Sequence, residues 1–320
     1  MMMRKLGRSG VSVSGIGLGC WAIGGVTWRD GKPCGWAGAD DTAAIAAIHE
    51  ALERGVNFLD TADVYGCGHS ERLIAKAIRG RRDKLILATK FGFPINEGDR
   101  TTSGERCEPE YIRSACDASL RRLETDHIDL YQFHLGGSSD GVAVRETLEQ
   151  LVIEGKIRYY GWSTDQPDKA RIFAEGKHCV AIQQHFNVVS GNEETLRVCE
   201  ENGLASINRG PLGMGILTGK FTAETKFPPD DVRHSWDLAA GNIADHLKKF
   251  EAVRDILTTG GRTLSQGAIC WLWARSPVTI PIPGFKNVAQ VTDNAGALKF
   301  APLAEDQMQE IDRLLSRAVS

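Results

Sequence analysis

The sequence predicts an α/β protein, namely a (β/α)8 TIM barrel with an N-terminal β-hairpin and an extra C-terminal helix. Short β-rich runs alternate with amphipathic segments along the whole chain. The length of 320 residues suits either two small domains or one large barrel. No low-complexity tract or Gly/Ser linker divides the chain. We therefore expect residues 1–320 to form a single barrel domain.

Eight β-rich runs are the expected barrel strands. They are residues 15–20, 56–60, 85–90, 128–134, 157–161, 180–184, 204–208 and 278–282. Helix-like segments lie between them, and eight strands separated by helices are typical of a closed barrel.

Two of the intervening segments show the helical pattern clearly. Residues 41–52 place four apolar side chains on one face, and Gly55 follows as a stop signal. These side chains are Ala44, Ile45, Ile48 and Leu52. Pro109 begins a second helix that carries Ile112, Cys116, Leu120 and Leu123.

The remaining segments are expected to cover the barrel. Residues 5–13 suit a hairpin across the barrel floor, and residues 305–317 suit a terminal helix on the outside or lip of the barrel, with Met308, Ile311, Leu314 and Leu315 on one face. The irregular segments 24–39 and 222–241 are candidate active-site lids.

The composition argues against several classes of partner. The chain has 38 basic and 41 acidic residues without a long like-charged block, so we expect no nucleic acid or anionic membrane partner. Its eight cysteines form no C-x-x-C pair, which favours reduced thiols in a cytoplasmic protein. No apolar run approaches the ~18 residues of a membrane helix.

Two glycine-rich segments fail as nucleotide-binding motifs. Residues 15–20 lack the third glycine of a dinucleotide fingerprint and do not lead into a helix. Residues 213–221 resemble a P-loop, but Met214 replaces its first glycine and Phe221 its Ser/Thr, so no hydroxyl is placed to hold Mg²⁺.

Four polar side chains converge at the predicted barrel mouth. Asp60, Lys90 and His134 end successive strands, and Tyr65 follows Asp60 closely. An ammonium beside a phenol lowers the phenol's pKa from about 10, while a carboxylate would keep the ammonium charged. With a histidine to hydrogen-bond a carbonyl oxygen, this set suits carbonyl reduction. Any one of these residues alone is better interpreted as structural, but four of them in register favour a catalytic site.

These residues carry a family resemblance. Segments 57–66 (NFLDTADVYG), 88–92 (ATKFG) and 129–134 (DLYQFH) resemble signatures of the aldo-keto reductases. The resemblance continues through 161–164, 183–187, 211–220 and 282–296, and so covers essentially the full chain in order. It implies an enzyme that binds NADP(H), less so NAD(H), and transfers a hydride to a small aldehyde or ketone. It also implies Tyr65 as proton donor, supported by Asp60, Lys90 and His134, in a monomer or small homo-oligomer.

The resemblance further implies the cofactor contacts. Ser163 and Gln183 match positions at the nicotinamide carboxamide, and the loop 210–215 with Lys220 matches the pyrophosphate site. Lys286 matches a partner of the 2′-phosphate. The full expected set is Gly19, Cys20, Trp21, Asp60, Ser163, Thr164, Gln183, Arg209, Gly210, Pro211, Leu212, Gly213, Gly215, Lys220, Gly284, Lys286, Gln290, Asp293 and Asn294.

The chain departs from the family pattern at four positions. Thr164 replaces a common Asn, Phe186 a common Tyr, and Cys20 a frequent Thr. Arg209 stands where many relatives stack an aromatic ring on the nicotinamide, which suggests an unusual cofactor pose or a polar substrate. Trp21, Phe91 and His134 are the expected substrate contacts, with Trp28 and Trp236 as further aromatics that could line the pocket.

Two alternative functions remain open. One is an NADPH-binding redox sensor with low turnover, because potassium-channel β subunits resemble the same family. The other is a metal-dependent barrel hydrolase or isomerase that uses Asp63, Cys67 and His69. We expect no metal, since residues 69–71 suit a helix start with Ser70 as N-cap and Glu71 in the first turn.

Overall fold

Eight parallel strands form the closed barrel that the sequence predicts. The computed structural model describes residues 2–134 and 141–316. Around the barrel the strands run in the order β3 (Leu18–Gly19), β6 (Phe58–Asp60), β7 (Ile86–Phe91), β10 (Ile128–His134), β11 (Ile157–Ser163), β12 (Cys179–Asn187), β14 (Ala205–Arg209) and β15 (Thr279–Pro281). A parallel bridge between Gly19 and Gly284 closes the ring.

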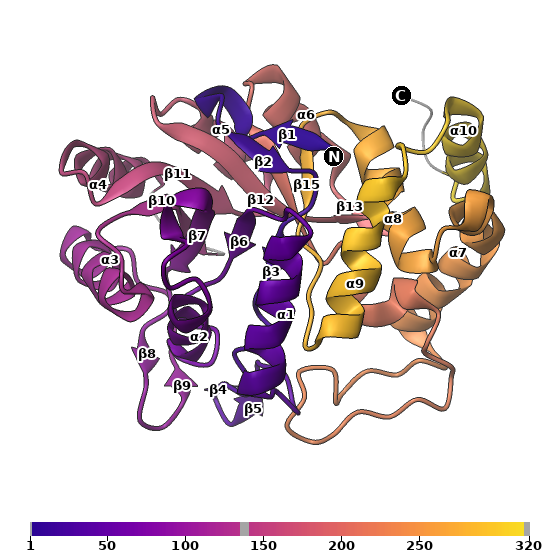
Figure 1. The fold of residues 1–320 in the computed structure, drawn as a ribbon, viewed down its shortest axis with the longest axis horizontal. Coiled ribbons are helices and arrows are strands. Elements are labelled where there is room, and N and C mark those ends of the chain that lie inside the picture. The colour runs from indigo at the N-terminus through magenta and orange to yellow at the C-terminus, as the bar shows by residue number, and fades with distance from the viewer. Residues whose placement is uncertain (1, 135–140, 317–320) are drawn as a thin grey trace.

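Helices surround the barrel (Figure 1). They are α1 (Asp41–Glu53), α2 (His69–Ala77), α3 (Pro109–Leu123), α4 (Gly141–Ile153), α5 (Pro167–Ala174), α6 (Glu193–Glu201), α7 (Gly241–Thr258), α8 (Leu264–Arg275), α9 (Val288–Gly296) and α10 (Glu305–Leu314). Short 3-10 turns cover Gly7–Ser9, Arg82–Lys84, Gly213–Thr218, Thr259–Gly261 and Ala297–Lys299. Helices α1 and α9 pack side by side where the first and last strands meet (Figure 1).

The predicted N-terminal hairpin closes the barrel floor. Strands β1 (Met3–Lys5) and β2 (Ser12–Ser14) pair antiparallel. Leu6, in the connection between the two strands, and Val13, in β2, are completely buried. Both side chains pack in one apolar cluster with barrel residues such as Leu130 and Ile207. The extra C-terminal helix α10 packs outside the barrel against α7 and α8. The end of its predicted range, Arg317, lies outside the described residues.

Three local expectations need correction. The first barrel strand is only the two residues of β3, because the preceding residues lead in from the hairpin. In α1 the fully buried face includes Ala47 and Ala51, while Ile45 and Leu52 lie at its partly buried edge. The N-cap of α2 is Gly68, at φ +86°, and not Ser70, whose hydroxyl donates instead to the Cys20 carbonyl at 2.9 Å.

Both predicted lids lie at the end of the barrel opposite the hairpin (Figure 1). In the first, β4 (Trp28–Arg29) pairs with β5 (Lys32–Pro33) and with β9 (Thr101–Thr102), which pairs with β8 (Ile95–Asn96). The second lid, residues 222–241, contacts the first, since the Val232 amide donates to the Gly35 carbonyl at 2.9 Å. A further short strand, β13 (Ser190–Gly191), pairs with β12.

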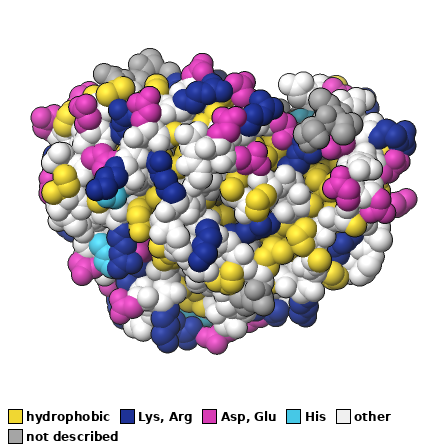
Figure 2. Space-filling view, turned by 90° about the horizontal axis from the view of Figure 1, so that it is seen from above, with side chains coloured by type: hydrophobic (Ala, Val, Ile, Leu, Met, Phe, Trp, Pro, Cys, Tyr) yellow, Lys and Arg dark blue, Asp and Glu magenta, His cyan; other side chains and the backbone are white. Residues whose placement is uncertain are grey.

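The surface mixes charges of both signs. On the face shown in Figure 2, basic and acidic side chains lie interspersed. Within residues 2–134 and 141–316, no helix combines the length and the apolar character that crossing a membrane requires.

Candidate active site

A cavity of about 610 Å³ lies at the carboxyl ends of the barrel strands. That volume suits a small-molecule or cofactor site. Among the described residues, its lining includes five basic side chains, which are Arg29, Arg209, Lys220, Arg233 and Lys286, and two acidic ones, Asp60 and Asp293. Because one of these carboxylates is already paired with a buried lysine, the cavity carries a positive electrostatic potential.

Three of the four predicted catalytic residues form a continuous hydrogen-bonded chain. Asp60 ends β6 and Lys90 lies near the end of β7, so both side chains enter the barrel at one level. Lys90 Nζ donates to Asp60 Oδ1 at 2.5 Å, to the Thr61 carbonyl at 2.8 Å and to the Tyr65 hydroxyl at 3.1 Å. The ammonium is therefore held against the phenol by a fixed set of acceptors.

Two glutamines complete the shell around the Asp60 carboxylate. Gln132 Nε2 and Gln183 Nε2 donate to Asp60 Oδ2 at 2.9 and 2.7 Å. All three residues, like Lys90, are at most 1% exposed. A buried carboxylate needs hydrogen-bond donors in addition to a cation. With the two glutamine donors and the lysine in place, the Asp60 carboxylate fixes the position of Lys90.

Burial and neighbouring charges set the pKa values of Lys90 and Tyr65. Burial penalises the charged ammonium of Lys90, but the effects of Asp60 and Tyr65 outweigh this penalty and raise the pKa of Lys90. For Tyr65, burial raises the pKa above its ordinary value, and the nearby Lys90 only partly opposes this shift. The expectation of a lowered Tyr65 pKa was wrong, because the sequence does not reveal how completely the phenol is desolvated. The phenol is therefore protonated at neutral pH.

His134 lies beside Tyr65 at the end of β10. The two rings meet edge to face with 6.0 Å between centroids. Burial, followed by the nearby Lys90, Arg209 and Arg29, lowers the pKa of His134 well below its ordinary value. Its Nδ1 is buried and has no hydrogen-bond partner among the described residues. A neutral imidazole with a spare nitrogen can hydrogen-bond a ligand oxygen.

The predicted nicotinamide residues lie one strand further around the barrel. Ser163 pairs in register with both His134 and Gln183. Its Oγ is buried and lacks a partner within the described part of the chain, so it can bond a polar group of a ligand. Gln183 lines the cavity, but its amide donates to Asp60. Neither Ser163 nor Thr164 is among the residues that line the cavity, and the Thr164 hydroxyl accepts from the Gln166 amide at 3.2 Å.

A basic cluster occupies the other side of the cavity. Arg233 forms a two-pronged ion pair with Asp231, at 2.8 and 2.9 Å, and its guanidinium lies 4.3 Å from the Trp36 ring centre. Lys286 Nζ donates to the Ala37 carbonyl. Burial is the main reason that the pKa of Lys286 is lowered, as it is for Lys220. Lys220, Arg233 and Lys286 bring three positive charges together, an arrangement suited to binding a polyanion.

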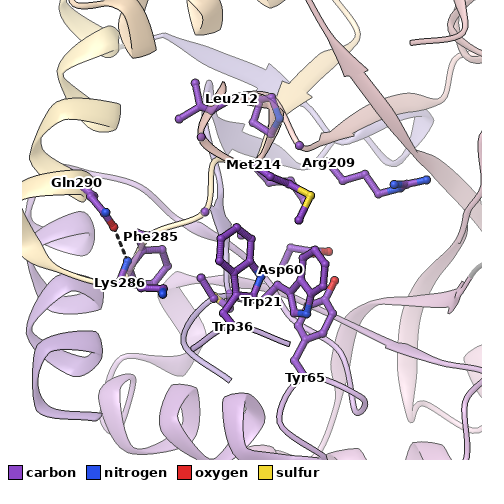
Figure 3. A pocket seen from close by; sticks show the side chains of 18 of the residues that line it. Trp21, Trp36, Asp60, Tyr65, Arg209, Leu212, Met214, Phe285, Lys286 and Gln290 are labelled. Atoms are coloured by element: carbon purple, nitrogen blue, oxygen red, sulfur yellow. Dashed lines mark hydrogen bonds between the residues drawn. The ribbon is translucent and has the colours of Figure 1, made fainter. Parts of the chain in front are cut away.

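The segment after β15 positions Lys286. The Lys286 amide donates to Gln290 Oε1 at 2.7 Å (Figure 3), and Asn294 Nδ2 reaches the Gly284 carbonyl at 3.4 Å. Asp293, also at the cavity wall, instead accepts from Thr263 at 2.7 Å. In Figure 3, Lys286 and Arg209 lie on opposite sides of the cavity, with Trp36, Trp21 and Tyr65 between them.

Arg209 is held at the rim and does not lie free in the cavity. Its guanidinium is paired with Asp165, whose other oxygen accepts from the His185 amide at 2.6 Å. The glycine-rich segment that follows Arg209 also lines the cavity, except that Gly213 is buried behind it. Gly19, Cys20 and Trp21 line the wall near Tyr65, and the Trp21 and Tyr65 rings stack with centroids 6.0 Å apart.

The structure does not place Phe91 at the cavity, so that expectation is corrected. Because side chains alternate along a strand, Lys90 points into the barrel and Phe91 points outward. There Phe91 stacks on Tyr131 and Phe133, with centroids 4.6 and 5.4 Å apart. Trp28 and Trp236 do not line the cavity either.

Sequence reasoning also missed several lining residues. They include Arg29, Cys34, Trp36, Phe93, His185 and Arg233. Most of these residues lie in the two segments predicted as lids, and that prediction was the one sequence signal for them. Phe93 gave none, because the chain turns at Gly92 directly after the strand.

The residues considered for a metal do not form one cluster. His69 Nε2 is paired with Asp41 at 2.8 Å, away from the carboxyl of Asp63. In the described ranges, no group of three or more His, Cys, Asp or Glu side chains is placed to hold a metal ion.

Comparison with known proteins agrees with this geometry. The family model described as "Aldo/keto reductase family" matches residues 15–316. The uncharacterized oxidoreductase YqkF of Bacillus subtilis is 32% identical, covering 97% of this chain and 95% of the relative. The glycerol dehydrogenase of Gluconobacter oxydans superposes with a TM-score of 0.85 at 29% identity, covering 99% of this chain and 96% of that one. An aldo/keto reductase of Klebsiella pneumoniae, solved with NADP and acetate, has a TM-score of 0.74 at 25% identity, with 100% and 98% coverage.

These findings define a barrel oxidoreductase. The chain belongs to the aldo/keto reductase family, as the resemblance of its sequence motifs implied.

Proposed function

We propose that this chain reduces an aldehyde or ketone to an alcohol with NADPH, and that Tyr65 donates the proton. The observation that carries the proposal is the buried chain from Asp60 through Lys90 to the Tyr65 hydroxyl, which opens into the cavity beside His134. The relative solved with NADP supports the choice of cofactor.

The residues of the cavity fit this dinucleotide. Gln183 lines the cavity, and Ser163, its neighbour on the next strand, does not; the Ser163 Oγ, buried without a partner among the described residues, is our choice for the nicotinamide carboxamide. Lys220, Arg233 and Lys286 would hold the phosphates, and Lys286 is our choice for the 2′-phosphate. When bound, NADPH supplies the hydride.

The chain's own residues supply the proton and the charge stabilisation. Tyr65 keeps its proton because burial raises its pKa, and it transfers that proton to the carbonyl oxygen as negative charge develops there. Lys90, fixed by Asp60, then stabilises the phenolate at 3.1 Å. His134 is neutral and would orient the carbonyl oxygen through a hydrogen bond.

A single-turnover experiment tests the proposal. Protein preloaded with NADPH is mixed with 4-nitrobenzaldehyde, and nicotinamide fluorescence is followed together with alcohol formation. Tyr65→Phe should still bind NADPH but reduce the aldehyde about 10²–10⁴-fold more slowly, the usual contribution of a general acid.

The outcomes separate the competing functions. Near-wild-type turnover by Tyr65→Phe would refute the proton-donor role. NADPH that binds to the wild-type protein but does not react would favour the redox-sensing function, and failure to bind NADPH would refute the cofactor assignment.

A further inference from the structure

Arg29 is a cation of the cavity that the proposed cofactor site does not use. It lies on β4 in the first lid, and its side chain lines the cavity. The guanidinium lies 4.1 Å from the centre of the Phe93 ring, which fixes its plane. Its Nε is buried without a hydrogen-bond partner, and within residues 2–134 and 141–316 the side chain forms no ion pair.

The position of Arg29 places it on the catalytic side of the cavity. Phe93, on which Arg29 stacks, meets His134 edge to face at 5.4 Å, and His134 meets Tyr65 in the same way at 6.0 Å. The charge of Arg29 reaches this histidine, since it contributes to the lowered pKa of His134. Three successive contacts, through Phe93 and His134, therefore connect Arg29 to the proposed proton donor Tyr65.

The other cations of the cavity already have a function or a partner. Arg233 and Arg209 are paired with Asp231 and Asp165. Lys220 and Lys286 lie in the basic cluster assigned to the cofactor phosphates. A guanidinium at the catalytic end has donors arranged to bind a carboxylate or phosphate with two hydrogen bonds.

We propose that Arg29 binds an anionic group of the substrate, so that the preferred substrates are small carbonyl compounds carrying a carboxylate or phosphate. The proposal rests on the proposed function, because it assumes that the carbonyl lies between Tyr65 and His134. Phe93 holds the guanidinium at the cavity wall.

The first test needs no turnover. Binding of benzoate to the full chain, with and without saturating NADP⁺, is followed by tryptophan fluorescence, since Trp21 and Trp36 line the cavity. Benzyl alcohol is the uncharged counterpart. Arg29→Gln should raise the benzoate Kd about tenfold or more, as expected for the loss of a hydrogen bond to a charged group. Arg29→Lys should restore part of the affinity because it keeps the charge.

The second test is the ratio of kcat/KM for 4-carboxybenzaldehyde to that for 4-nitrobenzaldehyde. Arg29→Gln should lower this ratio about tenfold. Phosphate and acetate added as inhibitors then show which anion the site prefers. The matched control is Lys32→Gln, which removes a charge from the exposed residue that pairs with Arg29 across the same hairpin and should change neither the ratio nor the benzoate Kd.

The outcomes distinguish this proposal from the proposed function. Arg29→Gln could still reduce 4-nitrobenzaldehyde, with an unchanged substrate ratio and an unchanged benzoate Kd. That result would overturn the anion site and leave the proposed reductase function intact. If benzoate binding depends on Arg29 but the protein reduces neither aldehyde, the anion site is supported and the proposed reductase function is refuted. An equal effect of Lys32→Gln would show a general charge effect and so overturn the site.

Discussion

Tyr65 and His134, the two titratable groups proposed to face the substrate carbonyl, are both uncharged at neutral pH for the same reason. Burial raises the pKa of Tyr65 and lowers the pKa of His134, because in each case it penalises the charged form. Lys90 strengthens the effect on His134 and opposes that on Tyr65. Burial thus keeps His134 neutral with support from Lys90, and the same lysine limits the rise in the pKa of Tyr65.

These shifts predict the pH dependence of the reduction. The Tyr65 phenol must be protonated to act, and its raised pKa keeps it so beyond the ordinary value of about 10. We therefore expect kcat/KM for 4-nitrobenzaldehyde to stay constant between about pH 6 and 9 and to fall only at higher pH. Since the pKa of His134 is well below normal, no inflection should occur near its ordinary value of about 6.5. A fall that begins below pH 8 would contradict this assignment.

At the scale of the element, a buried ion pair ties α2, α3 and β7 together behind the Tyr65 loop. Arg122 Nε of α3 donates to Glu71 Oε2 of α2 at 2.5 Å, and the hydroxyl of Thr89 in β7 donates to Glu71 Oε1 at 2.6 Å. The same arginine passes over Gly68, where a Cβ would meet Arg122 Cδ at 2.5 Å. Only glycine therefore fits this N-cap, at φ +86° and under a guanidinium.

Arg122→Met should strongly destabilise the fold. It leaves the Glu71 carboxylate fully buried with a single hydroxyl partner, and breaking such a pair costs about 3–5 kcal/mol. The matched control is Arg113→Met on the same helix, which removes a half-exposed ion pair with Glu154 and should cost less than about 1 kcal/mol. Urea denaturation of both variants measures the difference, and equal losses would contradict the structural role of the buried pair.

At the scale of the whole molecule, the barrel was predictable because its signals are local. The β-rich runs of the sequence end at Asp60, Lys90 and His134, and a closed barrel brings strand ends together. The lids were harder, since the position of Arg29 depends on β4 pairing with β9, about seventy residues away. The direction of the Tyr65 pKa shift was not predictable, because burial arises from the whole fold.

Three distant parts of the chain meet at Trp36 in the first lid. The Arg233 guanidinium of the second lid and the Lys286 ammonium after β15 lie 4.3 and 5.5 Å from the Trp36 ring centre. A dinucleotide bound to these cations would contact both lids and the last strand together. Its binding free energy should therefore stabilise the entire fold, by an amount that grows with the logarithm of the ligand concentration relative to Kd.

This predicts a thermal shift that depends on the 2′-phosphate. At 100 times its Kd, NADP⁺ should add about 2.7 kcal/mol and raise Tm by about 4 °C, whereas NAD⁺ at the same concentration should raise it less. Lys286→Gln should abolish the difference between the two dinucleotides, because it removes the cation proposed for that phosphate. Lys299→Gln, a change at an exposed lysine outside the cavity, should preserve it. Equal stabilisation of the wild-type protein by NAD⁺ and NADP⁺ would show that Lys286 does not select the phosphorylated cofactor.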